Sequence, residues 1–438
     1  MIMRKAEPAL LALALLFAIV FAGYAARQLP QQAASSSDTI HVVTVKNVFA
    51  DSEFKAVWVP YMSLDMSHEQ AQHFGAFKQK FDRIVAQVQA SGANTMIVHV
   101  RPFGDAMYRS AYFPWSHLLT GTQGQDPGYD PLAYMVEAAH AAGLKLHAWI
   151  NPLRIRSTQT PAQLAANNVR TVWQSDGDST NDDWTVECSS GIYLNPGYES
   201  VRTYIIDSVR ELIEHYAVDG VHMDDYFYPT QEESFDTTAY ANYCAGVSSD
   251  KEPLSLEAWR TENITALVKG LYDAVKAYDA NLQFGISPQG NRNNCAKACA
   301  DVAKWGGETG YVDYLCPQLY YPFQSPSQPF AQVAQEWRDM VTAPSVKLYG
   351  GLALYKAGDG EVDSGSWTSG DVLQRQIETL EQAGFGGFAL YSDAYLTGDQ
   401  TKTEMANVRA CLGVVDSAAQ NGASESAAEN AESVIRSE

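Results

Sequence analysis

Eight short apolar runs recur along the chain, and amphipathic stretches separate them. Each run has the β-branched and aromatic composition of a buried strand. The runs lie at residues 55–60, 95–100, 145–150, 220–224, 283–287, 311–318, 347–351 and 387–391. Helical patterns lie between them at residues 77–90, 131–142, 200–216, 259–278 and 369–383. This alternation predicts an α/β fold, a single (β/α)8 barrel of the TIM type over residues 52–414.

The two ends of the chain differ from this core. An apolar run from residue 8 to 26 follows Arg4 and Lys5, which is typical of a secretory signal or of an N-terminal membrane anchor, and residues 1–26 can be either. Residues 27–51 have the composition of a polar linker, and residues 415–438 that of a disordered tail. We therefore expect an exported protein, extracellular or held at the cell surface.

The charge balance limits the partners of the protein. The chain has 51 acidic and 30 basic residues, which gives a formal net charge of −21. A field of this sign repels phosphate backbones, so nucleic acid is not an expected partner. The apolar fraction of 46% is sufficient for a large core.

Residues 218–229 place two carboxylates where a buried strand ends. The first half of this segment is apolar, and Pro229 with the polar residues after it ends regular structure. In a barrel of parallel strands, catalytic groups lie at the carboxyl ends of the strands. The sequence therefore predicts Asp224 and Asp225 as the catalytic residues.

Polar and aromatic side chains follow the other predicted strands, where they would surround the same site. The candidates for substrate binding are Arg101, Asp105, Trp149, Asn151, His222, Tyr226, Gln318, Tyr320, Tyr321 and Asp393. Long loops at residues 153–197, 226–258 and 319–329 leave the same ends of the strands and would form walls around a cleft for a polymer. As a set, the aromatic rings favour a glycan, although core packing is the better explanation for any single ring.

Six motifs along the barrel carry a family resemblance. They are residues 55–59 (Lys-Ala-Val-Trp-Val), 94–104 (Asn-Thr-Met-Ile-Val-His-Val-Arg-Pro-Phe-Gly), 129–132 (Tyr-Asp-Pro-Leu), 147–152 (His-Ala-Trp-Ile-Asn-Pro), 194–197 (Leu-Asn-Pro-Gly) and 219–229. Together they resemble the glycosyl hydrolase-like 10 family of bacterial cell envelopes. The resemblance implies a (β/α)8 barrel that hydrolyses an envelope glycan, and one branch of the family is associated with peptidoglycan strands stripped of their peptides.

Neighbouring aspartates limit the mechanism. Glycosidases ordinarily hold two carboxyl groups on opposite sides of the scissile bond, roughly 5 to 10 Å apart, and adjacent residues suit this geometry poorly. They suit a substrate-assisted route, in which the 2-acetamido oxygen of the sugar attacks its own anomeric carbon. Paired aspartates at the end of strand four also resemble those of other N-acetylglucosaminidase barrels. Asp225 is the expected acid and Asp224 the expected polarising residue, with Asp393 and Glu187 as reserve carboxylates.

The other roles follow from this hypothesis. Asn151 and Arg101 are expected to hold hydroxyls or a lactyl carboxylate, and one of Tyr320 and Tyr321 to hydrogen-bond the acetamido group. For Arg101, an ion pair with Asp105 or Asp224 that fixes the rim is a nearly equal alternative.

Two rival functions remain open at this point. His99, His147 and His222 lie near strand ends and could belong to a metal-dependent hydrolase such as a deacetylase, but no strand carries a His-x-His pair. We expect these histidines to form hydrogen bonds within the barrel, and we expect no metal and no cofactor. The second rival is a non-catalytic barrel that binds glycan.

Six cysteines are compatible with disulfides in an exported chain. The one tight spacing, Cys295 to Cys299, predicts a local disulfide rather than zinc.

Overall fold

The computed structural model of the chain describes residues 48–50 and 53–414. The predicted signal or anchor, most of the predicted linker and the predicted tail lie outside the described residues. None of the helices within the described ranges has the length and apolar character needed to cross a bilayer.

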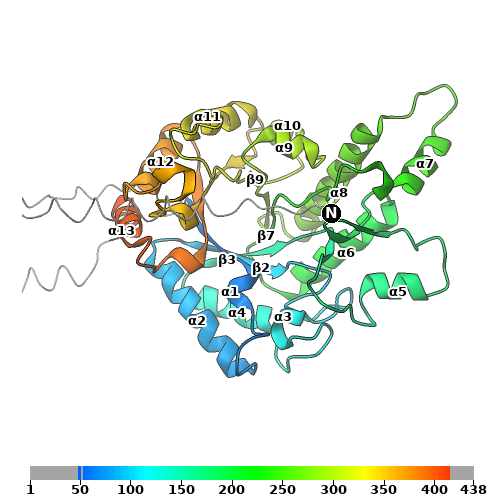
Figure 1. The fold of residues 1–438 in the computed structure, drawn as a ribbon, viewed down its shortest axis with the longest axis horizontal. Coiled ribbons are helices and arrows are strands. Elements are labelled where there is room, and N and C mark those ends of the chain that lie inside the picture. The colour runs from blue at the N-terminus through cyan, green and yellow to red at the C-terminus, as the bar shows by residue number, and fades with distance from the viewer. Residues whose placement is uncertain (1–47, 51–52, 415–438) are drawn as a thin grey trace, which may run out of the picture. The chain divides into compact units, whose positions relative to one another are not determined.

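A sheet of nine strands, all paired in parallel, forms the centre of the described chain (Figure 1). In the order of their pairing the strands are β10 (Lys347–Leu348), β9 (Tyr314–Leu315), β8 (Gln283–Ile286), β7 (Gly220–Met223), β3 (Lys145–Ile150), β2 (Thr95–Arg101), β1 (Phe54–Val59), β12 (Gly387–Tyr391) and β11 (Gly350–Leu352).

The sheet closes on itself through the seventh strand position. Only Tyr349 separates β10 from β11, and these two short strands pair with β9 and with β12 respectively. Two further hydrogen bonds join β11 to the segment that follows β9. The backbone N–H of Gly351 donates to the carbonyl of Pro317 at 2.9 Å, and the N–H of Leu319 donates to the carbonyl of Gly351 at 2.8 Å. The predicted (β/α)8 barrel is confirmed.

Helices surround the strands on the outside of the barrel (Figure 1). The longer ones are α2 (Phe74–Ala90), α4 (Pro131–Ala141), α6 (Glu199–His215), α8 (Leu256–Tyr278), α11 (Phe330–Met340), α12 (Val372–Gln382) and α13 (Lys402–Cys411). Some of these helices have recognisable sequence signals at their starts. At α4, for example, the Asp130 side chain accepts from the N–H of Ala133 at 3.1 Å, and Pro131 occupies the first helical position.

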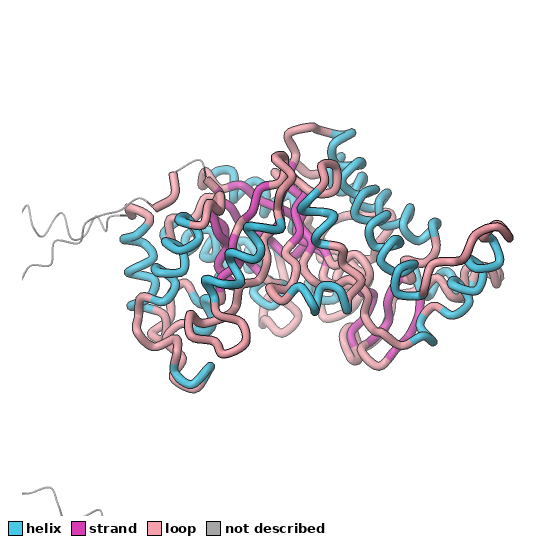
Figure 2. Tube along the Cα trace, turned by 90° about the horizontal axis from the view of Figure 1, so that it is seen from above, coloured by secondary structure: helices cyan, strands magenta, loops and turns pink. Residues whose placement is uncertain are grey.

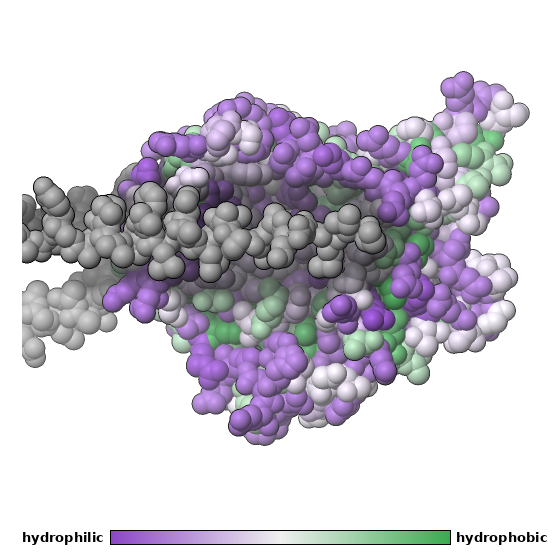
Figure 3. Space-filling view, viewed as in Figure 1, coloured by the Kyte–Doolittle hydropathy of each residue, from purple (hydrophilic) through white to green (hydrophobic). Residues whose placement is uncertain are grey.

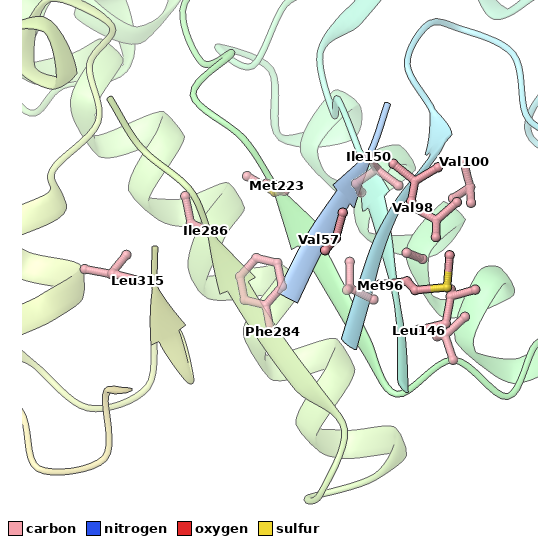
Figure 4. Close-up of a cluster of buried hydrophobic side chains, with 14 of the residues drawn as sticks. Val57, Met96, Val98, Val100, Leu146, Ile150, Met223, Phe284, Ile286 and Leu315 are labelled. Atoms are coloured by element: carbon pink, nitrogen blue, oxygen red, sulfur yellow. The ribbon is translucent and has the colours of Figure 1, made fainter. Parts of the chain in front are cut away.

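The two faces of the barrel strands differ in chemistry because side chains alternate along a strand. One set of residues is mostly aliphatic and packs in the same buried cluster as residues of the outer helices, as Figure 4 shows for Val57, Val98 and Met223. The other set fills the interior and includes Trp58 and Trp149. The interior therefore has rings and polar groups beneath the site, and the exterior holds the helices.

The long βα loops contain regular structure of their own. After β3 the chain forms a three-stranded antiparallel sheet in the order β4 (Arg154–Ser157), β6 (Gly191–Leu194), β5 (Thr185–Cys188). This second group of strands is set apart from the barrel strands in Figure 2. The remaining helical elements are α1 (Tyr61–Leu64), α3 (His117–Thr120), α5 (Val169–Ser175), α7 (Thr237–Gly246), α9 (Arg292–Lys297), α10 (Val302–Gly307), η1 (Glu233–Phe235), η2 (Leu354–Lys356), η3 (Val362–Gly365) and η4 (Asp393–Tyr395).

On the face drawn in Figure 3, hydrophilic residues cover much of the surface, and hydrophobic residues show in small patches, some near the middle and some at the right-hand side. This distribution is typical of amphipathic helices that turn one apolar stripe toward a core.

Two predictions about local structure are corrected. All six cysteines are free, so the predicted disulfide between Cys295 and Cys299 is wrong. Cys295 lies on α9, where its thiol is 3.1 Å from the carbonyl of Gln289, whereas Cys299 follows the helix and hydrogen-bonds Thr261. The sixth strand is shorter than predicted, because regular pairing there ends before Pro317.

Candidate active site

Asp224 and Asp225 directly follow β7, at the carboxyl end of the barrel, and both line a pocket there. Asp224 is 4% exposed, and Asp225 is half-buried. The remaining lining residues come from the ends of several strands and are Trp58, Pro60, Tyr61, Met62, His99, Trp149, Arg154, Tyr226, Ser287, Gln318, Tyr320 and Tyr391. The two aspartates are the only carboxylates among the described residues that line this pocket.

Asp224 accepts hydrogen bonds on both of its oxygens. The amide Nδ2 of Asn151 donates to Oδ1 at 2.6 Å and to Oδ2 at 2.7 Å, and Nε1 of Trp149 donates to Oδ2 at 3.0 Å. The backbone N–H of Tyr226 donates to Oδ1 at 3.2 Å. Because every one of these partners is a donor, the surroundings of Asp224 are built for the ionised carboxylate.

The orientation of Asn151 follows from its neighbours. Since Nδ2 faces the carboxylate, Oδ1 faces the other way, and it accepts from Nε2 of His99 at 2.7 Å and from Nη2 of Arg154 at 2.9 Å. The His99 ring stacks on Trp149 with centroids 3.7 Å apart and planes 9° apart. Burial, followed by the charge of Arg154, lowers the pKa of His99 well below its usual value, so His99 is neutral.

A chain of hydrogen bonds extends below this layer into the barrel. Nε1 of Trp58 donates to Nε2 of His222 at 3.3 Å, so Nδ1 of His222 carries the proton and donates to the Tyr314 hydroxyl at 2.9 Å. That hydroxyl then donates to Nδ1 of His147 at 2.9 Å. Gly285 makes room for this arrangement, since a Cβ there would lie 1.9 Å from the Tyr314 ring.

The three histidines named as possible metal ligands are therefore engaged in hydrogen bonds with other side chains. Burial lowers the pKa of His147 to about 4 and that of His222 well below its usual range, so both rings are neutral. Within residues 48–50 and 53–414, no three side chains of His, Cys, Asp or Glu converge as a set that could hold a metal ion.

Asp225 has fewer partners than Asp224. Nε2 of Gln318 donates to its Oδ1 at 3.0 Å and also lies 3.1 Å from the carbonyl of Ser287. Burial, followed by the neighbouring Asp225 carboxyl, raises the pKa of Asp224 to about 7, and burial raises the pKa of Asp225 as well. Two neighbouring carboxyl groups oppose each other's ionisation and titrate as a pair. The donors around Asp224 favour its ionised form, which leaves Asp225 as the better holder of a proton.

The structure brings six of the predicted substrate-binding residues to this site. Trp149, Tyr226, Gln318 and Tyr320 line the pocket. Asn151 and His222 lie buried behind the lining, where Asn151 holds Asp224 and His222 bonds to Trp58. The other four predicted residues, Arg101, Asp105, Tyr321 and Asp393, do not line it.

Arg101 is turned away from the pocket by an irregularity in the sheet. Regular alternation would point Arg101 inward with His99, but the pairing of β2 with β3 shifts register between these two residues. Arg101 therefore pairs with Ile150, which belongs to the outer core, and its guanidinium lies over the Phe113 ring, 4.4 Å from the centroid. Arg101 does not line the pocket, and no ion pair joins it to Asp105 or Asp224 within the described residues.

Asp105, Tyr321 and Asp393 lie in structural environments. Asp105 is fully buried and accepts from Nδ1 of His117 at 2.7 Å and from Nε2 of Gln123 at 2.9 Å. Tyr321 packs against Gly290. Asp393 is buried and accepts from the Ser63 hydroxyl at 2.8 Å.

The lining residues that the sequence did not assign include Tyr61, Met62 and Tyr391. Tyr391 had a usable signal, because it shares strand parity with the interior residue Ala389. Arg154 was among the polar candidates because it follows the third predicted strand, and in the structure it begins a strand of the second sheet.

Comparisons with known proteins agree with this geometry. The family model described as Glycosyl hydrolase-like 10 matches residues 53–369. Glycosyl hydrolase YngK of Bacillus subtilis (strain 168) is 33% identical over 363 residues, which cover 78% of this chain and 68% of that protein. Glycosyl hydrolase DigH of Escherichia coli (strain K12) is 30% identical over 368 residues, which cover 79% of this chain and 82% of that protein.

Among solved structures, the beta-galactosidase from the psychrophilic Marinomonas ef1 matches with a TM-score of 0.50 at 10% identity, covering 81% of this chain and 59% of that chain. This likeness concerns the fold alone. The family match and the identity to the two relatives carry the assignment: the chain belongs to the glycosyl hydrolase-like 10 family, as the sequence resemblance predicted, and with it to the glycoside-hydrolase class of enzymes.

Proposed function

We propose that this protein hydrolyses a cell-envelope glycan built of N-acetylated sugars, the glycan strands of peptidoglycan, by a substrate-assisted mechanism. The observation that carries the proposal is the identity of the carboxylates in the pocket. They are neighbours in sequence, Asp224 and Asp225, and no other carboxylate lines the pocket in the described part of the chain. The described lining therefore lacks a carboxylate on the opposite side of the scissile bond. The acetamido group of the substrate can supply the missing nucleophile.

In the first step, the acetamido oxygen bonds to the anomeric carbon of its own sugar, and the glycosidic bond breaks. Asp225 donates its proton to the departing oxygen, as its raised pKa allows. Asp224, fixed by Asn151 and Trp149, accepts the acetamido N–H and stabilises the positive charge that develops on the amide. The product of this step is a cyclic oxazolinium ion.

In the second step, water attacks the same anomeric carbon from the side that the leaving group vacated. Asp225, now ionised, accepts a proton from this water and regains its starting state. The carbon–oxygen bond of the oxazolinium ring breaks and restores the acetamido group. Two inversions at one carbon give net retention of the anomeric configuration.

The residues favour this reaction over a metal-dependent deacetylation. A zinc hydrolase needs three protein ligands around one ion, whereas His99 bonds to Asn151, and His147 and His222 both bond to the Tyr314 hydroxyl. The proposal also includes the place of action. A glycan of the envelope lies outside the cytoplasm, and the apolar run at residues 8–26 is the segment that would export or anchor the chain.

The experiment uses the full-length chain and purified peptidoglycan, with and without prior removal of peptides by an amidase. Released sugars are identified by mass spectrometry. Wild type should release N-acetylated oligosaccharides, and Asp225→Asn should release none. Asp207→Asn, which changes a carboxylate of the outer helix α6, is the matched control and should behave as wild type.

Intact glycan after treatment with wild type would contradict the proposal. Retained binding without cleavage would instead favour the glycan-binding barrel.

A further inference from the structure

A second pocket adjoins the active site. The two share Pro60, Met62, Tyr320 and Tyr391 among their lining residues, so they form one continuous cleft. The second pocket is completed by Ser63, Tyr355, Ser392, Ala394 and Tyr395. It lies over the ends of β1, β11 and β12, away from the side of the mouth that β2 and β3 build.

Tyrosine rings form the wall of this second pocket. Tyr355 lies edge-on to Tyr320 and to Tyr391, with ring centroids 5.9 Å and 6.1 Å apart, and 6.3 Å from Tyr395. All four rings are half-buried and so present partly open surface. Flat rings with hydroxyl tips suit the apolar faces and the hydroxyl groups of an uncharged sugar.

Among the described residues that line the second pocket, none is charged. Its lining residues are apolar, aromatic or hydroxyl-bearing. Two charged residues lie close by, but both are engaged elsewhere. Asp393 is buried against Ser63, and the Lys356 ammonium bonds to the carbonyl of Tyr320 at 3.0 Å and to Asp363 at 3.1 Å.

The opposite end of the cleft holds a fixed positive charge, Arg154. Its guanidinium lies over the rings of Phe103 and Tyr226, 4.8 Å from each centroid. Nε donates to the carbonyl of Pro102 at 2.8 Å and Nη2 to Oδ1 of Asn151, while Nη1 forms no hydrogen bond within the described residues. Arg154 is the one lysine or arginine among the described residues that line either pocket.

This charge is adjacent to the catalytic pair. One amide, that of Asn151, bonds to Arg154 through its oxygen and to Asp224 through its nitrogen. In an N-acetylated sugar acid with a lactyl ether, the acetamido and lactyl groups are on neighbouring carbons. A sugar whose acetamido group meets Asp224 can thus present its carboxylate toward Arg154. The protein has a net charge of −21, so an acidic sugar needs such a local cation.

We propose that the cleft distinguishes the two sugars that alternate along the glycan strand. The sugar whose acetamido group reacts carries the carboxylate, which Arg154 binds, and the neighbouring sugar in the tyrosine-lined pocket is uncharged. The inference rests on the proposed function and adds the choice of linkage. Of the two linkages in an alternating strand, only the one that leaves the acidic sugar at the new reducing end is cleaved.

The first test identifies that reducing end and requires only wild type. Amidase-treated glycan is digested, reduced with borohydride and hydrolysed, and the resulting alditols are separated. The alditol of the lactyl-bearing sugar is expected. The alditol of N-acetylglucosamine would overturn the inference while leaving the proposed hydrolysis intact, whereas no new reducing end at all would be a failure of the proposed function.

The second test neutralises the carboxylate. Reduction of the lactyl carboxylates to alcohols gives an uncharged glycan of the same length. Wild type should lose about 10-fold to 100-fold in kcat/KM on this glycan, as expected for loss of a charge-assisted hydrogen bond. Arg154→Gln should lose a similar factor on the native glycan and show a ratio near unity between the two substrates.

Lys269→Gln is the matched control, because it removes a cation that pairs with Asp273 on the outer helix α8, and it should keep the wild-type ratio. Arg154→Lys retains the charge and should retain part of the ratio. Equal rates of wild type on both glycans would overturn the role of Arg154.

Discussion

The two halves of the cleft differ in their side chains and in how those side chains are held. The half built by β2, β3 and β7 holds Asp224 in a closed set of hydrogen bonds, and each neighbour has a second partner that fixes it. The half at the ends of β1, β11 and β12 is made of half-buried tyrosine rings in edge-on contact. The first half holds charged groups in fixed positions, and the second half presents aromatic surface on which a sugar can bind.

The difference shows where precision matters. Charge that develops in a transition state is stabilised only by groups that are already oriented, and in the catalytic half Asp224 is held by hydrogen bonds from Asn151 and Trp149. A sugar ring that only has to bind can be held by flat surfaces, which tolerate small shifts. Changes in the first half should therefore reduce kcat, and changes in the second half should raise KM.

The largest effect is expected for Asp225→Asn, because it removes the proton donor. On the glycan, kcat should fall by about 10³-fold, in the range for loss of a general acid. A substrate with a nitrophenolate leaving group needs no proton, so Asp225→Asn should keep most of its first-step rate there, while Asp224→Asn should not. The opposite pattern in steady-state and burst kinetics would exchange the two roles.

Asn151→Ala should cost less, on the order of 10²-fold in kcat, because Asp224 stays but loses two hydrogen bonds. Those bonds lower the pKa of Asp224, so their removal should raise that pKa and move the acidic limb of the activity profile, where Asp224 loses its charge, to higher pH. Asn407→Ala removes a comparable amide bond on α13 and is the control. An unchanged pH profile would contradict the proposed function of Asn151.

Tyr355→Ala should affect binding alone. Loss of the ring that contacts Tyr320, Tyr391 and Tyr395 should raise KM by about 10-fold and change kcat little, since the ring lies outside the catalytic pocket. Tyr355→Phe keeps the ring and should stay within about 2-fold to 3-fold of wild type in KM. A fall in kcat with constant KM would place Tyr355 with the catalytic half.

The smallest effect concerns stability rather than activity. Burial raises the pKa of Asp393 from 3.8 to about 6, so the folded state binds this proton more tightly than the unfolded state does. Stability should therefore decline as pH rises from about 4 to 6. Asp393→Asn keeps an acceptor for Ser63 and removes the ionisation, so at pH 7 it should gain on the order of 1 to 3 kcal/mol. Thermal melts between pH 4 and 8 would measure this, and parallel curves for both proteins would refute it.

The strand pattern was visible in the sequence because barrel strands are buried on both faces, and each appears as a continuous apolar run. Asp224 and Asp225 stood out because they interrupt such a run. Arg101 was misplaced because a register shift in one strand pair reverses the facing of a side chain without leaving a mark in the sequence. The hydrogen-bond partners of Arg154 and Asp105 depend on loop structure. Loops bring together residues that the periodicity of strands and helices does not relate.

The central claim is that the acetamido group of the substrate acts as the nucleophile beside Asp224 and Asp225. The most direct test measures kcat/KM on aryl glycosides whose acetamido group carries zero, one, two or three fluorine atoms. Fluorine makes the amide oxygen a weaker nucleophile, so the account predicts a steep and continuous fall across the series. Rates that hardly change with fluorination would show that the acetamido oxygen takes no part and would contradict the account.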